Sequence, residues 1–321
     1  MKADHLLGNS SGLPFPSREL APGDRFPNFL LPDQTGTVRS FLERAIGHRL
    51  LLLIDPDDDT IRAVAGMPLA AAGIDLLAIV PGSPSDAKGR ALRCGVDFPL
   101  LADGNGKILT ALQGLANASA PAKLAFLLDA NQRVLSVEYD GDLETWLRQW
   151  QGSPPAMATA PCLNQVAPVL IVPNVLSPEM CRGLIGRWET IGHEEGGVHS
   201  IVEGVEVTRT YHAMKRRRDH KIKDAAILKP LIQLVGRRLA PELDKAFAFN
   251  GFKFDRFIVT CYEAERGDYF RRHRDNLSPS TADRRFALTI NLNTPEYEGG
   301  ELVFPEYGPE RYSPPAGGAI L

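Results

Sequence analysis

The sequence predicts two domains, an α/β domain followed by an α+β domain with short antiparallel strands. The chain has 321 residues, which is too long for one ordinary core. Apolar runs alternate with helical stretches between residues 22 and 150. After Asn250 the pattern changes to short strands separated by Gly, Pro and Asn, which is typical of an antiparallel sandwich or barrel.

The expected boundaries follow from changes in composition. Residues 1–19 are polar and interrupted by Gly, Pro and Ser, so we expect a flexible arm. Residues 20–150 form the first domain. Residues 151–165 have neither helical nor strand periodicity and are interpreted as a linker, and residues 166–321 form the second domain.

The overall composition excludes several classes of protein. Hydrophobic residues make up 44% and charged residues 23%, which is ordinary for a globular protein. The net charge of −3 gives no general reason to expect a nucleic acid or a membrane as partner. The local basic run at residues 215–218 is interpreted as a solvated face. Nothing in the pattern indicates an oligomeric state.

Cysteine usage and the N-terminus indicate the compartment. The four cysteines are far apart and form no C-x-x-C motif. We therefore expect a reducing environment. Residues 1–12 lack the apolar core of a signal peptide, and no apolar run is long enough to span a bilayer. The expected location is cytoplasmic.

The first domain is predicted element by element. The predicted strands share short apolar runs, at residues 50–54, 74–80, 125–128 and 134–138. The predicted helices are residues 60–72, 108–115 and 143–150. Pro68 should kink or divide the first of these helices, because proline cannot donate the helical hydrogen bond.

The second domain begins with two predicted helices. Ser177, Pro178 and Glu179 form a helix start, with a hydroxyl cap followed by proline and an acid in the first turn. A second helix is predicted over residues 224–239. The predicted strands that follow are short and alternating, at residues 257–262, 269–275, 286–292 and 301–305.

A histidine and an acid two positions apart point to a metal site. In a strand, His273 and Asp275 would share one face. Imidazole and carboxylate ligands form the facial triad of non-haem Fe(II) enzymes. The spacing alone is weak, because seven His and 39 acids among 321 residues produce about one such pair by chance. The second match, His193 to Glu195, lies among glycines and is interpreted as a surface loop.

The context of this pair is more specific than the pair itself. An ordered set of motifs surrounds it: Tyr262, Gly267, His273-Arg274-Asp275, residues 285–293, Gly299-Gly300-Glu301 and Phe304-Pro305. With this set, residues 260–320 resemble the prolyl 4-hydroxylase-type family of Fe(II)/2-oxoglutarate dioxygenases.

The resemblance implies a double-stranded β-helix (jelly roll) that binds Fe(II) through His273 and Asp275, with Tyr262 near 2-oxoglutarate. The family chemistry is oxidative decarboxylation of 2-oxoglutarate to succinate, coupled to hydroxylation of a C–H bond, and ascorbate often keeps the iron reduced. The substrate stays open between a prolyl residue in a peptide, a free amino acid and a small metabolite.

The family pattern also requires a second histidine ligand, about 50 residues after the H-x-D. This sequence has no histidine after His273. We therefore expect an incomplete C-terminus, from a truncated chain or an incomplete gene model. The alternative is that an upstream histidine replaces the ligand, namely His193, His199, His212 or His220.

The first domain resembles peroxiredoxin-like, thioredoxin-fold proteins, on residues 22–36 and on the strand pair at residues 125–138. Active members carry a cysteine at the helix start after the first buried strand. Here residues 55–60 hold Asp, Pro and Thr, which suit helix capping. Cys94 is interpreted as an inert thiol, and a docking or substrate-presenting role is expected. The alternative for the whole chain is a non-catalytic binding or scaffold protein.

Overall fold

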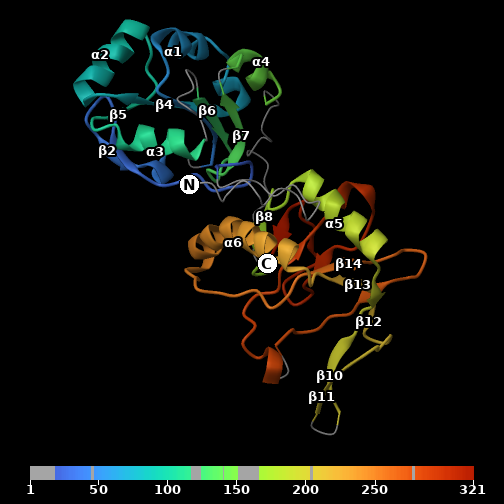
Figure 1. Cartoon of the computed structure of the whole chain (residues 1–321). Helices are drawn as coiled ribbons and strands as arrows, with labels where there is room; N and C mark the ends of the chain where they lie inside the picture. The colour runs from blue at the N-terminus through green and yellow to red at the C-terminus, as the bar shows by residue number, and fades with distance from the viewer. Residues whose placement is uncertain are drawn as a thin grey trace. The chain divides into compact units, whose positions relative to one another are not determined.

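The chain forms two compact units (Figure 1). One spans Pro16–Cys162 and the other contains Leu163–Leu321. The computed structural model describes residues 19–44, 47–116, 124–139, 141–150, 166–202, 205–276 and 279–321. Residues 1–18 of the predicted arm and the whole predicted linker, residues 151–165, lie outside the described residues.

The N-terminal unit is built on a five-stranded sheet with the order β5-β4-β3-β6-β7. Its strands are β3 (Arg49–Ile54), β4 (Ile74–Pro81), β5 (Leu100–Asp103), β6 (Leu124–Leu128) and β7 (Val134–Tyr139). Strands β3, β4 and β5 are parallel, whereas β6 runs antiparallel to β3 and forms a hairpin with β7. A small hairpin pairs β1 (Leu30–Pro32) with β2 (Val38–Ser40).

Alternation along β3 explains why the sheet is covered on both faces. Leu50, Leu52 and Ile54 point into one core, which also contains helix α3 (Lys107–Leu115). Leu51 and Leu53 point into the other core. Because successive strand residues face opposite sides, an uninterrupted apolar strand needs helices on both faces.

The second face is covered by helices α1 (Asp58–Ala65), α2 (Pro84–Cys94) and α4 (Leu143–Arg148) (Figure 1). The resulting three-layer arrangement confirms the predicted α/β class and is thioredoxin-like. The predicted strands at 50–54, 74–80, 125–128 and 134–138 are all present, within one or two residues.

Two details of this unit differ from the prediction. The helix expected over residues 60–72 stops at Ala65, and a separate 3-10 turn follows at Ala70–Ala72. The break precedes Pro68, which has no N–H for a helical hydrogen bond. Helix α2 and strand β5 were not predicted, because residues 84–94 are largely polar and β5 is only four residues long.

The C-terminal unit packs two helices against short strands. Helix α5 (Pro178–Ile191) begins where predicted, and the Ser177 hydroxyl accepts a hydrogen bond from the Met180 amide at 3.2 Å. Helix α6 (Ala225–Phe247) extends eight residues beyond the predicted end at 239. The helix continues past Pro241, and Glu242 and Leu243 in the following turn are buried.

The strands of this unit form small antiparallel sheets. One has the order β16-β19-β8 (Thr289–Ile290, Ala319–Ile320, Ile171–Val172), and another has the order β14-β13-β9 (Ile258–Cys261, Arg218–Lys221, Glu194–Glu195). The pairs are β12 (Lys215–Arg216) with β15 (Tyr269–Phe270), β17 (Leu302–Val303) with β18 (Arg311–Tyr312), and β10 (Val198–Val202) with β11 (Val205–Arg209).

These strands are shorter than predicted. The strands expected over residues 286–292 and 301–305 are reduced to β16 and β17. The sheets agree with the predicted α+β class, while a closed jelly roll stays a prediction. Among the described residues, no helix has both the length and the apolar character needed to cross a bilayer.

Candidate metal and co-substrate site

The candidate site begins at a strand that changes partners. Lys215 in β12 lies opposite Phe270 in β15, whereas Arg218 in β13 lies opposite Cys261 in β14. Arg217 falls between the two pairings. Its side chain therefore reaches both Phe270 at the end of β15 and Tyr262 just after β14.

The charged residues Lys215, Arg217 and Asp219 are two positions apart and meet on one side of this strand. The side chain of Lys215 is only 5% exposed, and its Nζ donates to the carbonyl oxygen of Gly197 at 2.7 Å. That of Arg217 is 16% exposed. The interpretation of residues 215–218 as a solvated basic face is therefore wrong for these two residues, because Asp219 balances them within the fold.

Arg217 makes polar contacts at both ends of its guanidinium group. Its Nε lies 2.8 Å from Oδ1 of Asp219, and its Nη1 donates to the hydroxyl oxygen of Tyr262 at 2.9 Å. The guanidinium carbon lies 5.6 Å from the ring centre of Tyr262 and 5.3 Å from that of Phe270. These distances are within the range of cation–π attraction.

His273 and Asp275 come together as predicted, but on a different local structure. The expected strand over residues 269–275 ends at Phe270, so the pair lies in irregular backbone beyond β15. The imidazole of His273 stacks on the Phe270 ring, with ring centres 3.7 Å apart and planes 19° apart. Its Nε2 lies 3.2 Å from Oδ1 of Asp275.

The second nitrogen of this imidazole has its own partner. Nδ1 of His273 lies 2.8 Å from the carbonyl oxygen of Arg271. A carbonyl oxygen can only accept, so Nδ1 is the donor, and in the neutral ring the lone pair is then on Nε2. Nε2 is the atom that faces Asp275. Because its lone pair is free in this neutral tautomer, Nε2 can act as a metal ligand.

Electrostatics set the protonation of the pair in the metal-free chain. When it is protonated, the imidazole of His273 donates a hydrogen bond from Nε2 to the Asp275 carboxylate, and this bond raises the pKa of His273 above its usual value. The same hydrogen bond lowers the pKa of the Asp275 carboxyl, assisted by the charges of His273, Arg284 and Arg256. Burial and the neighbouring charge of Arg217 lower the pKa of Lys215 to about 8.

The two donor atoms fit adjacent positions around one metal ion. Ligands about 2.1 Å from an ion and at right angles to each other are about 3 Å apart. The observed 3.2 Å between Nε2 of His273 and Oδ1 of Asp275 is close to this value. Within the described part of the chain, no group of three or more His, Cys, Asp or Glu side chains is placed to hold a metal.

The residue predicted to lie near 2-oxoglutarate, Tyr262, is 47% exposed. It belongs to the same cluster as His273 through Arg217 and Phe270. The sequence interpretation missed Arg217 and Phe270. The alternation of Lys215, Arg217 and Asp219 was the available signal, because charges two apart in a strand share a face.

The upstream H-x-E match has another role. Glu194 and Glu195 form strand β9 rather than the expected loop, because they pair with β13. Glu194 binds Lys221 at 2.5 Å and Glu195 binds Arg266 at 2.5 Å. His193 stacks on Trp188 with ring centres 4.0 Å apart. All three side chains thus have partners other than each other.

The start of helix α1, directly after β3 in the N-terminal unit, confirms that residues 55–60 serve in helix capping. Asp57 caps helix α1 and accepts a hydrogen bond from the Thr60 amide at 2.6 Å. Asp58 binds Arg90 at 2.7 Å. Cys94 is the last residue of helix α2, and burial together with the charge of Asp58 raises the pKa of its thiol.

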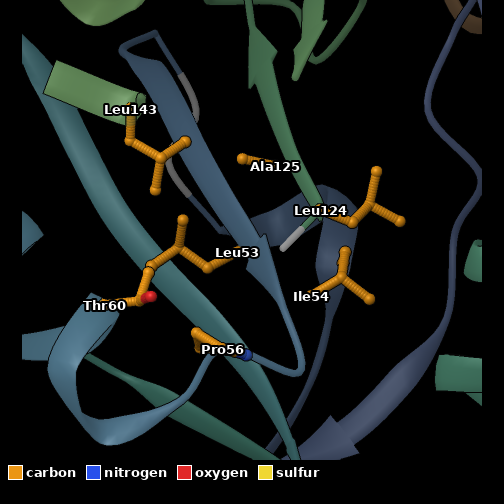
Figure 2. Close-up of a pocket in the computed structure, with 7 residues that line it drawn as sticks. All are labelled: Leu53, Ile54, Pro56, Thr60, Leu124, Ala125 and Leu143. Atoms are coloured by element: carbon orange, nitrogen blue, oxygen red, sulfur yellow. The ribbon is translucent and has the colours of Figure 1, made fainter. Parts of the chain in front are cut away.

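A small cavity lies beside the start of α1 (Figure 2). Its volume of about 10 Å³ has room for roughly one water molecule. Apolar residues and Thr60 line it: Leu53, Ile54, Pro56, Thr60, Leu124, Ala125 and Leu143. The Thr60 hydroxyl has no hydrogen-bond partner among the described residues. No thiol is among these lining residues, so the cavity offers no redox group.

Comparison with known proteins gives matches to solved structures alone. No family model matches, and no curated protein matches. The peroxidoxin BcpB of Mycobacterium tuberculosis is 22% identical, with a TM-score of 0.35 over 41% of this chain and 95% of its own. A thiol peroxidase of Chromobacterium violaceum is 18% identical, with a TM-score of 0.35 over 43% of this chain and 91% of its own.

A peroxiredoxin-like protein of Aquifex aeolicus is 15% identical, with a TM-score of 0.34 over 41% of this chain and 87% of its own. The similarity falls on the N-terminal unit. The sheet order β5-β4-β3-β6-β7 and the helices on its two faces define the thioredoxin-like fold of that unit independently.

Proposed function

We propose that the C-terminal unit is a 2-oxoglutarate- and O2-dependent oxygenase that binds Fe(II) through His273 and Asp275. The observation that carries the proposal is the 3.2 Å approach of Nε2 of His273 to Oδ1 of Asp275, since it matches two adjacent ligands of one ion. The ordered motifs from Tyr262 to Phe304 add the resemblance to a family with this chemistry.

The chain's own residues would hold and orient the reactants. Hydrogen bonding of Nδ1 to the Arg271 carbonyl leaves Nε2 to donate its lone pair to the metal. Tyr262 lies beside the cation Arg217, so this side of the site suits a carboxylate of 2-oxoglutarate. When bound, Fe(II) would supply the oxygen chemistry that these side chains cannot perform. Ascorbate is the proposed reductant.

We propose that the reaction hydroxylates a C–H bond of a peptide or a small molecule, and a prolyl residue is one candidate substrate. We further propose that the N-terminal unit docks or presents the substrate. Its helix start after β3 carries Asp57 and Asp58 where active redox relatives carry a cysteine, and these carboxylates are engaged in capping and ion pairing.

A non-catalytic binding or scaffold protein is the second candidate. One observation favours this second candidate. Among the described residues, His273 and Asp275 lie together with no third candidate metal ligand beside them, whereas a facial triad needs three.

Succinate release separates the two functions. The full chain would be incubated with Fe(II), 2-oxoglutarate and ascorbate, and succinate measured against His273→Ala and His48→Ala. His48 is an exposed histidine of the other unit, 64% exposed at its side chain, and serves as the matched control. The oxygenase proposal expects iron-dependent succinate from the native chain and from His48→Ala, and none from His273→Ala. Succinate at the same background level from all three proteins would support the non-catalytic binding or scaffold function.

A further inference from the structure

We propose that Arg217 is a positioning residue, which fixes the orientation of the His273 imidazole by way of the Phe270 ring. The proposal rests on the proposed function in one respect, namely that His273 is a metal ligand. Arg217 makes no hydrogen bond, ion pair or ring contact with His273 or Asp275, although its charge acts on His273 at longer range. Its effect on the orientation of the imidazole passes through the aromatic side chain of Phe270.

The contacts form a continuous path. Asp219 is buried, and its carboxylate holds the guanidinium group of Arg217 at 2.8 Å. The same guanidinium lies 5.3 Å from the centre of the Phe270 ring, and that ring stacks on His273 at 3.7 Å. Each step joins a residue to the next through a geometry that depends on orientation.

Phe270 is held by two cations. Nζ of Lys215, directly opposite it in the β12–β15 pair, lies 5.2 Å from its ring centre, and Arg217 is diagonal to it. Lys215 is fixed by its hydrogen bond to Gly197, and Arg217 is fixed by Asp219 and the hydroxyl of Tyr262. Because β15 ends at Phe270, no strand pairing of its own holds the backbone at His273.

Three contacts restrain the imidazole, and one of them is the 3.2 Å approach of Nε2 to Oδ1 of Asp275. The hydrogen bond from Nδ1 to the Arg271 carbonyl selects the tautomer. It does not prevent rotation of the ring about that bond. The stacking on Phe270 fixes the ring plane, and so the position of Nε2 relative to Oδ1 of Asp275. Displacing Phe270 would move Nε2 away from the carboxylate.

Lysine cannot replace Arg217 in this role. A guanidinium group is planar and can pair with Asp219, donate to Tyr262 and lie over a ring at once, whereas an ammonium is a point charge. Arg216, one position earlier, provides a matched control. It points to other partners, with Nε 3.7 Å from Asp268, and its side chain is 44% exposed.

The experiment follows the His273 Cε1–H resonance in the metal-free 321-residue chain labelled with 13C-histidine, and His273→Ala assigns this resonance. The stacked ring shifts this resonance, and Phe270→Leu defines the unstacked position. We expect Arg217→Gln and Arg217→Lys to move it most of the way to that position, and Arg216→Gln to leave it unchanged. Circular dichroism confirms folding. Arg217→Lys retains a positive charge beside Asp219, and so keeps the test usable if Arg217→Gln does not fold.

Co(II) affinity gives the second readout. Arg217→Gln and Arg217→Lys should weaken it about tenfold, as loss of an outer-shell support does. Variants that combine an Arg217 substitution with Phe270→Leu should bind Co(II) no more weakly than the single variants, because both substitutions interrupt the same path of contacts. An unmoved His273 resonance in both Arg217 variants, with a moved one in Phe270→Leu, overturns the inference. Failure of the native chain to bind Co(II) overturns the proposed function instead, and the resonance still decides the role of Arg217.

Discussion

The amide of Leu176 donates a 2.8 Å hydrogen bond to the carbonyl oxygen of Gly317, which joins the start of the C-terminal unit to its last strand region. Gly317 has a φ of +73°, and a Cβ at this position would overlap the carbonyl oxygen of Leu176. The amide of Gly317 also donates to the carbonyl of Asn291 at 2.7 Å. This close approach fixes β19 between β16 and β8.

Gly317→Ala should therefore lower the free energy of unfolding of this unit by about 3 kcal/mol, from backbone strain and overlap together. Urea unfolding measures it. Gly299→Ala is the matched control, because Gly299 has a φ of +83° but no atom within 4 Å of the added Cβ. It should lose only about 1 kcal/mol. Equal losses in the two variants would show that contact with Leu176 is unimportant.

The lowered pKa of Lys215 predicts that the folded chain becomes more stable as the pH rises. Its pKa of about 8 in the folded chain lies below the ordinary 10.5. Between these values the unfolded chain binds more protons than the folded chain, so stability increases as pH rises through this window and the cost of the buried charge applies below it. The slope from one such group approaches about 1.4 kcal/mol per pH unit.

Urea unfolding between pH 7.5 and 10 would compare the native chain with Lys215→Met. The variant should lack this part of the rise. Lys221→Met, at a lysine paired with Glu194 and 47% exposed, controls for loss of a lysine and should keep it. A native profile that matches Lys215→Met throughout would rule out the lowered pKa.

The sequence predicted four of the five strands of the N-terminal sheet, because each of these four follows a short, largely apolar run, and β3 alone requires both faces to be covered. The C-terminal strands were overestimated. Alternating residues such as those at 286–292 satisfy a strand pattern, but the regular strand covers only Thr289–Ile290, with two further backbone hydrogen bonds at Asn291. Periodicity records which side chains are buried and does not record which backbone groups are paired.

The site was predicted in part for a related reason. Motif order located His273 and Asp275, and they do meet. Arg217 could not be assigned, because its contacts depend on the change of strand partner between Lys215 and Arg218. Registers of this kind join segments about 50 residues apart and leave no local pattern beyond the alternating charges.

Cys94 should not support peroxide reduction. Burial and the charge of Asp58 raise the pKa of its thiol, so little of the reactive thiolate is present near neutral pH. We expect hydrogen peroxide consumption by the native chain, with a thiol reductant present, to equal that of Cys94→Ser and to stay near the rate of a free cysteine. Rapid consumption that disappears in Cys94→Ser would instead establish a thiol peroxidase.

The most direct test of the account is a Co(II) titration of the full chain at neutral pH, followed by visible absorption, with Co(II) standing in for Fe(II). The native chain and His220→Ala should bind one ion with the same affinity, since the imidazole of His220 is engaged with the Gly192 carbonyl at 2.6 Å. His273→Ala and Asp275→Ala should each lose more than the roughly 100-fold that removal of an outer-shell partner costs. Equal affinity in all four proteins, or no binding by the native chain, would contradict a metal site at His273 and Asp275.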